Sequence, residues 1–133
     1  FNESWPVVMV GLDLTHQALA TPEVEQRFAA LGTPVGDLVV GLFGAFRTNY
    51  KDNQGFDNPP VHDPCCIAYL IDPSVVKTVP VPVDVELSGA LTAGRTVADF
   101  RAPAPADCHT SVATELDADR FWDLVVRAAE NLG

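Results

Sequence analysis

Residues 7–14 read VVMVGLDL, an apolar run interrupted only by Gly11 and Asp13. Strands that are covered on both faces have this composition, which is typical of parallel sheets with helices on each side. We therefore predict a strand over residues 7–14 in an α/β sheet. Because this is the only strand of that buried type in the sequence, we expect its neighbours to come from sequence outside this chain.

Two helices are predicted after this strand. The first begins at Pro22, because Thr21 can cap it and apolar side chains follow at helical spacing; Gly32 and Pro34 end it. The second is predicted over residues 36–50. Its expected apolar face consists of Leu38, Leu42 and Phe46, with Val39 and Phe43 beside it.

The second half of the chain has the pattern of antiparallel strands. Residues 79–87 alternate between apolar and polar or proline, which predicts one half-buried strand, and Pro80 and Pro82 confine its start to an edge. Gly94 marks a turn before a partner strand over residues 96–101. The sequence thus predicts an antiparallel hairpin region beside the parallel sheet.

The chain ends in a predicted strand and helix. A strand over residues 111–116 leads through Asp117, a good helix cap, into a helix. Its expected apolar face consists of Phe121, Leu124, Val125, Ala128 and Leu132. The predicted fold class is α/β: a truncated C-terminal portion of an open, mostly parallel sheet with flanking helices plus an antiparallel hairpin region.

Composition and charge exclude several classes of partner. With 133 residues and 47% hydrophobic content, the chain fits a single globular domain. The net charge of −10 and eight scattered Lys and Arg residues argue against binding to nucleic acid or to an anionic membrane. Three cysteines form a poor disulfide framework, which predicts reduced thiols and a cytoplasmic protein.

Residues 60–65 read PVHDPC and carry the most suggestive chemistry of the sequence. His62 and Asp63 stand where a polar loop ends and an apolar helix begins. An imidazole beside a carboxylate on rigid backbone suits catalysis or binding of a hard cation. An ordinary helix start, with Asp63 as cap and Pro64 at the first helical position, explains the same residues. The local sequence leaves both interpretations open.

Three segments resemble the inosine-uridine nucleoside hydrolase family, in order along nearly the whole chain. They are WPVVMVGLDLTHQAL at residues 5–19, PPVHDPCCIAYLIDP at residues 59–73 and VELSGALTAGRTVADFR at residues 85–101. The family's opening Asp-x-Asp-x-x-x-Asp-Asp cluster and its Glu-Phe-Asn element have no match. The resemblance therefore implies that residues 1–133 are the C-terminal part of a single nucleoside-hydrolase-like domain.

The resemblance also implies a reaction and a set of residues. Members of the family hydrolyse ribonucleosides to ribose and free base, with calcium holding the ribose hydroxyls. It assigns Asp63 to the metal, His62 to the base as catalytic and substrate-binding residue, and Tyr50 to a base contact. Because His precedes the aspartate, an inosine-uridine or pyrimidine preference is expected. The partner would be a small nucleoside, and the enzyme a homo-oligomer.

The sequence leaves two other functions open and offers further candidate site residues. The chain could be a non-catalytic α/β binding or assembly module of the same architecture, or a complete small enzyme that uses His62 and Asp63 differently. Asp13, Thr15 and His16 follow the predicted parallel strand, where ligands gather in α/β sheets, although a structural hydrogen bond is the commoner role. Arg47 is expected to be a solvated charge, and His109 is expected to be a surface residue.

Overall fold

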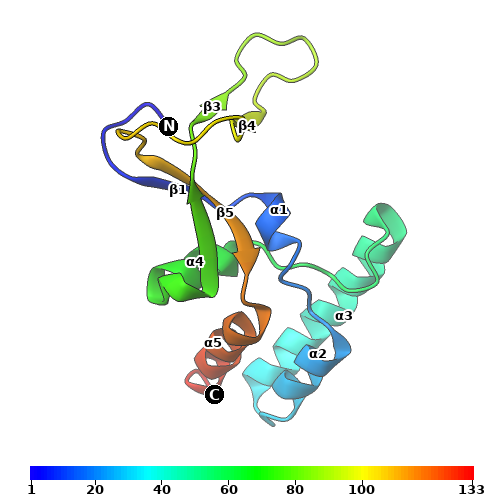
Figure 1. The fold of residues 1–133 in the computed structure, drawn as a ribbon. Coiled ribbons are helices and arrows are strands. Elements are labelled where there is room, and N and C mark those ends of the chain that lie inside the picture. The colour runs from blue at the N-terminus through cyan, green and yellow to red at the C-terminus, as the bar shows by residue number, and fades with distance from the viewer.

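A three-stranded sheet stands over a group of helices in the computed structural model, which describes all 133 residues (Figure 1). The strands are β1 (Val7–Met9), β2 (Val76–Pro80), β3 (Val83–Val85), β4 (Thr96–Ala98) and β5 (Thr110–Leu116). The helices are α1 (Leu12–Thr15), α2 (Pro22–Ala29), α3 (Pro34–Gln54), α4 (Asp63–Ile71) and α5 (Ala118–Glu130), with a 3-10 turn η1 (Pro73–Val75) after α4. The α/β fold class with an antiparallel hairpin is confirmed.

The sheet has the strand order β1-β5-β2, with β5 in the middle. β1 pairs in parallel with β5, and β2 pairs with it antiparallel. The expectation that the first strand would find no neighbour within this chain was therefore wrong. The sequence concealed this pairing because β5 contains Thr110, Ser111 and Thr114, which interrupt the apolar run typical of a buried parallel strand.

Two predicted strands are shorter than expected. The first ends at Met9, and Leu12 to Thr15 turn into the helix α1, which buries Leu14. The alternating stretch 79–87 breaks between Pro80 and Val83, so that its two halves join different sheets. Pro80 does lie on an edge strand, as predicted, because β2 is the last strand of the sheet. The hairpin β3–β4 projects away from the helices (Figure 1).

Side-chain caps fix where the helices begin. The hydroxyl of Thr21 accepts a hydrogen bond from the Val24 amide at 3.4 Å, and Asp117 accepts one from Arg120 at 3.1 Å, both as predicted. Thr33 caps α3, which therefore begins at Pro34 rather than at residue 36. α3 continues to Gln54 and ends at Gly55, whose positive φ of 74° is the left-handed conformation that glycine adopts without strain.

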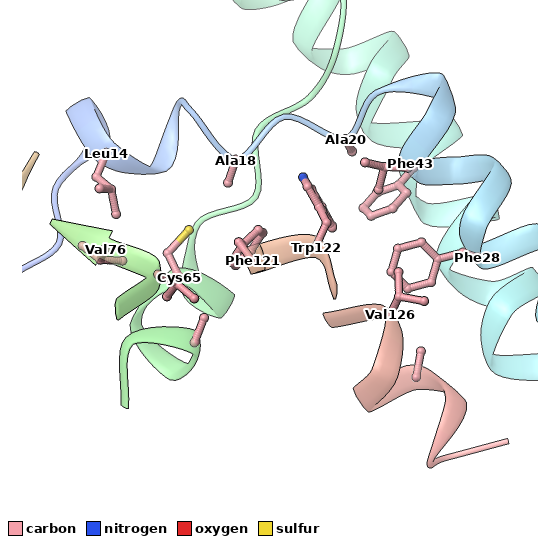
Figure 2. Close-up of a cluster of buried hydrophobic side chains, with 14 of the residues drawn as sticks. Leu14, Ala18, Ala20, Phe28, Phe43, Cys65, Val76, Phe121, Trp122 and Val126 are labelled. Atoms are coloured by element: carbon pink, nitrogen blue, oxygen red, sulfur yellow. The ribbon is translucent and has the colours of Figure 1, made fainter. Parts of the chain in front are cut away.

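Aromatic side chains from α2, α3 and α5 form the core between these helices (Figure 2). Phe28 and Phe43 pack edge-to-face on each other and on Trp122, with ring centroids 5.7 to 6.3 Å apart. On α3 this buries Phe43 and leaves the predicted face of Leu38, Leu42 and Phe46 exposed. On α5 the buried residues are Phe121, Trp122, Val126 and Ala129, while Leu132 is exposed, so this predicted face was only partly right.

The helices are also short or polar relative to membrane-spanning segments. None of them combines the length and the apolar composition that crossing a bilayer requires.

Candidate active site

A short bridge between two loops places the His62 backbone. Leu19 and Pro60 form an isolated antiparallel bridge, the Ala20 amide donates to the Pro59 carbonyl at 2.9 Å, and the Val61 amide donates to Ala18 at 3.0 Å. The segment that leads into α4 is therefore held against the segment that follows α1. His62 emerges from this rigid backbone as the residue immediately before α4.

Both ring nitrogens of His62 have a hydroxyl partner from another helix. Nδ1 lies 2.8 Å from the Oγ1 of Thr15, at the end of α1. Nε2 lies 2.8 Å from the Oη of Tyr50, in the last turns of α3. The structure thus brings together three of the residues that the sequence singled out, although they are separated by up to 47 positions. An imidazole held at both nitrogens is fixed in orientation, as proton transfer requires.

Aromatic rings surround this pair of hydrogen bonds. His16 meets His62 edge-on with ring centroids 5.8 Å apart, and it meets Phe56 at 5.0 Å. Phe56 also lies 6.1 Å from the Tyr50 ring. Sequence reasoning missed Phe56. The available signal was an aromatic side chain within the otherwise polar segment 49–58, where such a ring needs a packing partner.

Asp63 is the first residue of α4, and its carboxylate is free. His62 occupies the cap position, no side chain caps this helix, and the Asp63 carboxylate makes no hydrogen bond. The interpretation of Asp63 as the helix cap was therefore wrong. Its side chain is exposed and lines a surface pocket with Phe46, Tyr50 and His62. A carboxylate at a helix N-terminus is favoured by the helix dipole and remains available to a ligand.

This chain contains no cluster of side chains that could hold a metal ion by itself. No group of three or more His, Cys, Asp or Glu side chains lies close enough to hold an ion. Asp13, the other aspartate that the sequence singled out, lines a different pocket with Met9 and Phe100. Asp63 therefore offers one oxygen-bearing side chain to a cation that would need most of its ligands from elsewhere.

Arg47 was expected to be a solvated charge, and that expectation was wrong, whereas His109, expected at the surface, is partly exposed. The Arg47 guanidinium donates to the carboxylate of Glu25, to the side chain of Asn58 at 2.8 Å and to the carbonyl of Ala20 at 3.1 Å. It thereby ties α3 to α2 and to the loop that precedes His62. The His109 ring lies 2.7 Å from the Phe1 carbonyl, far from this pocket.

The two adjacent cysteines differ in environment. Cys65 is completely buried behind the pocket, whereas Cys66 is exposed, and all three cysteines are free thiols. Burial, with a smaller effect from the neighbouring Cys66, raises the pKa of the Cys65 thiol to about 11. Cys65 is thus a neutral packing residue, as predicted for at least one of the pair.

Comparisons with known proteins identify relatives of this chain. The sequence profile of the family described as "Inosine-uridine preferring nucleoside hydrolase" matches residues 1–123. Proteins of that name from Crithidia fasciculata and Leishmania major are each 53% identical to this chain over 133 residues, which is 100% of this chain and 42% of each relative.

The fold has a solved counterpart as well. The structure of a purine-preferring ribonucleoside hydrolase from Gardnerella vaginalis superposes with a TM-score of 0.80 and 28% identity, and the match covers 96% of this chain and 40% of that one. The chain thus spans less than half the length of each of these three relatives. On the match of the profile to residues 1–123, the chain belongs to the inosine-uridine preferring nucleoside hydrolase family.

Proposed function

We propose that this chain supplies the base-binding side of a ribonucleoside N-ribohydrolase site in the whole protein. The observation that carries the proposal is the His62 ring, held at Nδ1 by Thr15 and at Nε2 by Tyr50, directly beside the free carboxylate of Asp63. The 53% identical relatives are named for inosine and uridine, which supports these nucleosides as substrates.

His62 would act on the departing base. In the reaction the bond between ribose C1′ and the base nitrogen breaks and its electron pair leaves with the base. A water oxygen adds to C1′ and gives up a proton to a general base, which the rest of the whole protein would supply. The base therefore gains negative charge, which a hydrogen bond or a proton from an imidazole stabilises. His62 is the catalytic residue in this proposal, and Tyr50, at the same pocket, contacts the base.

Asp63 would be a ligand to calcium. Calcium prefers oxygen ligands and takes six to eight of them, and a bound ion would orient the sugar and make a water molecule more nucleophilic. Asp63 fits one of those positions because its carboxylate is exposed and makes no hydrogen bond. With no further cluster in this chain, the remaining protein ligands must come from other residues of the whole protein.

Calcium titration of the whole protein and of its Asp63→Ala variant tests this assignment. Loss of a ligand should weaken calcium affinity by roughly 10-fold or more and abolish turnover. The stability cost should stay near 0.3–1 kcal/mol, because Asp63 contributes only a helix-dipole interaction and no capping bond. Asp37→Ala is the matched control, since Asp37 is an exposed aspartate in the first turn of α3. Equal calcium affinities in the two variants would refute the assignment.

We also propose that the whole protein is a homo-oligomer located in the cytoplasm. The oligomer rests on the resemblance to the family. The apolar side chains of α4 that are exposed in this chain, Ile67, Leu70 and Ile71, need a cover, which the rest of the domain or a second subunit supplies. The free thiols support a reducing compartment. Sedimentation of the whole protein tests the oligomer, and a monomer at micromolar concentration would refute it.

A further inference from the structure

Thr15 bonds the His62 ring, but the proposed reaction gives Thr15 itself no role. It is the last residue of α1, its side chain is buried with 4% exposure, and its hydroxyl lies 2.8 Å from Nδ1 of His62. The hydroxyl has no other hydrogen-bond partner in the structure. Breaking the single hydrogen bond of a buried hydroxyl is costly, because it leaves both the donor and the acceptor without a partner.

The backbone around Thr15 is held on both sides. Its amide donates to the Gly11 carbonyl at 3.1 Å, and its carbonyl accepts from the Ala18 amide at 3.0 Å. Leu14 and Ala18, which flank this turn, are completely buried. Thr15 is therefore a fixed support. The opposite partner of His62, Tyr50, stands only four residues before the end of α3 and lies at the rim of the pocket.

We propose that Thr15 is a positioning residue for His62: the Thr15 hydroxyl holds Nδ1, and this turns Nε2 towards the pocket, where Tyr50 bonds it in this structure and where the proposed function places the departing base. The inference rests on the proposed role of His62. A hydroxyl suits this task because it can either donate to an unprotonated nitrogen or accept from a protonated one. It therefore holds the ring in one orientation in either tautomer, and the Thr15 side chain that supplies it is only 4% exposed.

Two pairs of variants in the whole protein isolate the effect of this hydroxyl. Thr15→Val removes the oxygen and keeps the shape of the side chain. Thr15→Ser and Thr15→Ala differ from each other by one oxygen, so the comparison stands even where the valine variant folds poorly. The kcat and KM of each variant are measured with inosine and with nitrophenyl riboside, whose leaving group needs no proton.

Thr110→Val is the matched control. Thr110 is also a threonine with 4% exposure, and its hydroxyl donates to the Val81 carbonyl at 2.6 Å in β5, away from His62. Thr110→Val therefore removes the same hydroxyl group from an equally buried position. Its ratio of kcat for inosine to kcat for nitrophenyl riboside should equal that of the parent, because the hydrogen bond it breaks does not involve the imidazole.

The expected result is a loss of kcat that depends on the leaving group. Thr15→Val should lower kcat for inosine by roughly 10-fold to 100-fold, while KM and the kcat for nitrophenyl riboside change much less. Thr15→Ser should stay near the parent and Thr15→Ala should follow the valine variant. A Thr15→Val protein whose kcat ratio matches that of Thr110→Val would overturn the inference, as would equal ratios for Thr15→Ser and Thr15→Ala.

The same assays separate this inference from the proposed function. His62→Ala measured in parallel reports on the proposed role of the imidazole itself. If His62→Ala loses activity mainly on inosine while Thr15→Val and Thr15→Ala do not, only the positioning role is wrong. If His62→Ala loses the same factor on both substrates, the proposed role of His62 is wrong, and the positioning role with it.

Discussion

Arg47 connects the stability of the fold to the loop that carries His62. Its guanidinium bonds the Glu25 carboxylate, the Asn58 side chain and the Ala20 carbonyl, so that one side chain joins α2, α3 and the segment before α4. Replacing Arg47 with Met keeps the apolar stem and removes these three bonds together with a longer one to the Asp57 carbonyl, at 3.5 Å. The Glu25 carboxylate, with a side chain 23% exposed, would then lose its cationic partner.

The partial burial of the Arg47–Glu25 ion pair determines how much stability Arg47→Met should lose. Exposed ion pairs contribute about 0–1 kcal/mol, and breaking a fully buried pair costs about 3–5 kcal/mol. With side chains 25% and 23% exposed, the Arg47–Glu25 pair lies between these cases, and its two further hydrogen bonds are lost as well. We therefore expect Arg47→Met to lower the free energy of unfolding by about 2–3 kcal/mol.

Urea unfolding of the whole protein, with Arg27→Met as control, measures this effect. Arg27 makes a comparable single ion pair to Asp123, but its side chains are 39% and 63% exposed, so its removal should cost no more than about 1 kcal/mol. Arg47→Met should also lower kcat, since the loop before His62 loses an anchor. Equal unfolding midpoints for the two variants would refute the anchoring role of Arg47.

Two further predictions concern the thiols and the chain by itself. At pH 8 a thiol reagent should label Cys66 before Cys65, which mass spectrometry can check; prior labelling of Cys65 would contradict this prediction. The free energy of unfolding should fall as pH rises from about 9 towards 11, because the unfolded chain then loses the Cys65 proton that the folded chain retains. Unfolding measured as a function of pH checks this second prediction. The 133-residue chain alone should not hydrolyse inosine or uridine, because it offers one carboxylate to a cation. It should also self-associate through the exposed apolar faces of α3 and α4, and a monodisperse, active monomer in light scattering and activity assays would refute this prediction.

Local signals in the sequence predicted the elements better than their packing. Thr21 and Asp117 cap helices where expected, because a cap depends on a few neighbouring residues. The α3 face was wrong because that helix is apolar on more than one side, and contact with Phe28 and Trp122, not periodicity, selects Phe43 for burial. The parallel pairing of β1 with β5 joins residues about a hundred positions apart, which no local pattern encodes.

For the candidate site, too, the sequence indicated individual residues better than the contacts between distant segments. The local sequence singled out His62 and Asp63, and the resemblance to the family gave them roles and added Tyr50. The structure brings His62 and Tyr50 into hydrogen-bonding contact. The Thr15–His62 bond was invisible in the sequence because it depends on how α1 packs against the loop before α4. The anchoring role of Arg47 was missed for the same reason, since its three partners lie on three separate segments.

The effect of His62→Ala on kcat for two substrates with different leaving groups tests the central claim most directly. The measurement is kcat of the whole protein and of the variant with inosine and with nitrophenyl riboside. If His62 acts on the departing base, kcat for inosine should fall by about 100-fold to 10,000-fold, and kcat for nitrophenyl riboside should fall far less. Equal losses on the two substrates would contradict the account and would assign His62 to the sugar or to the fold.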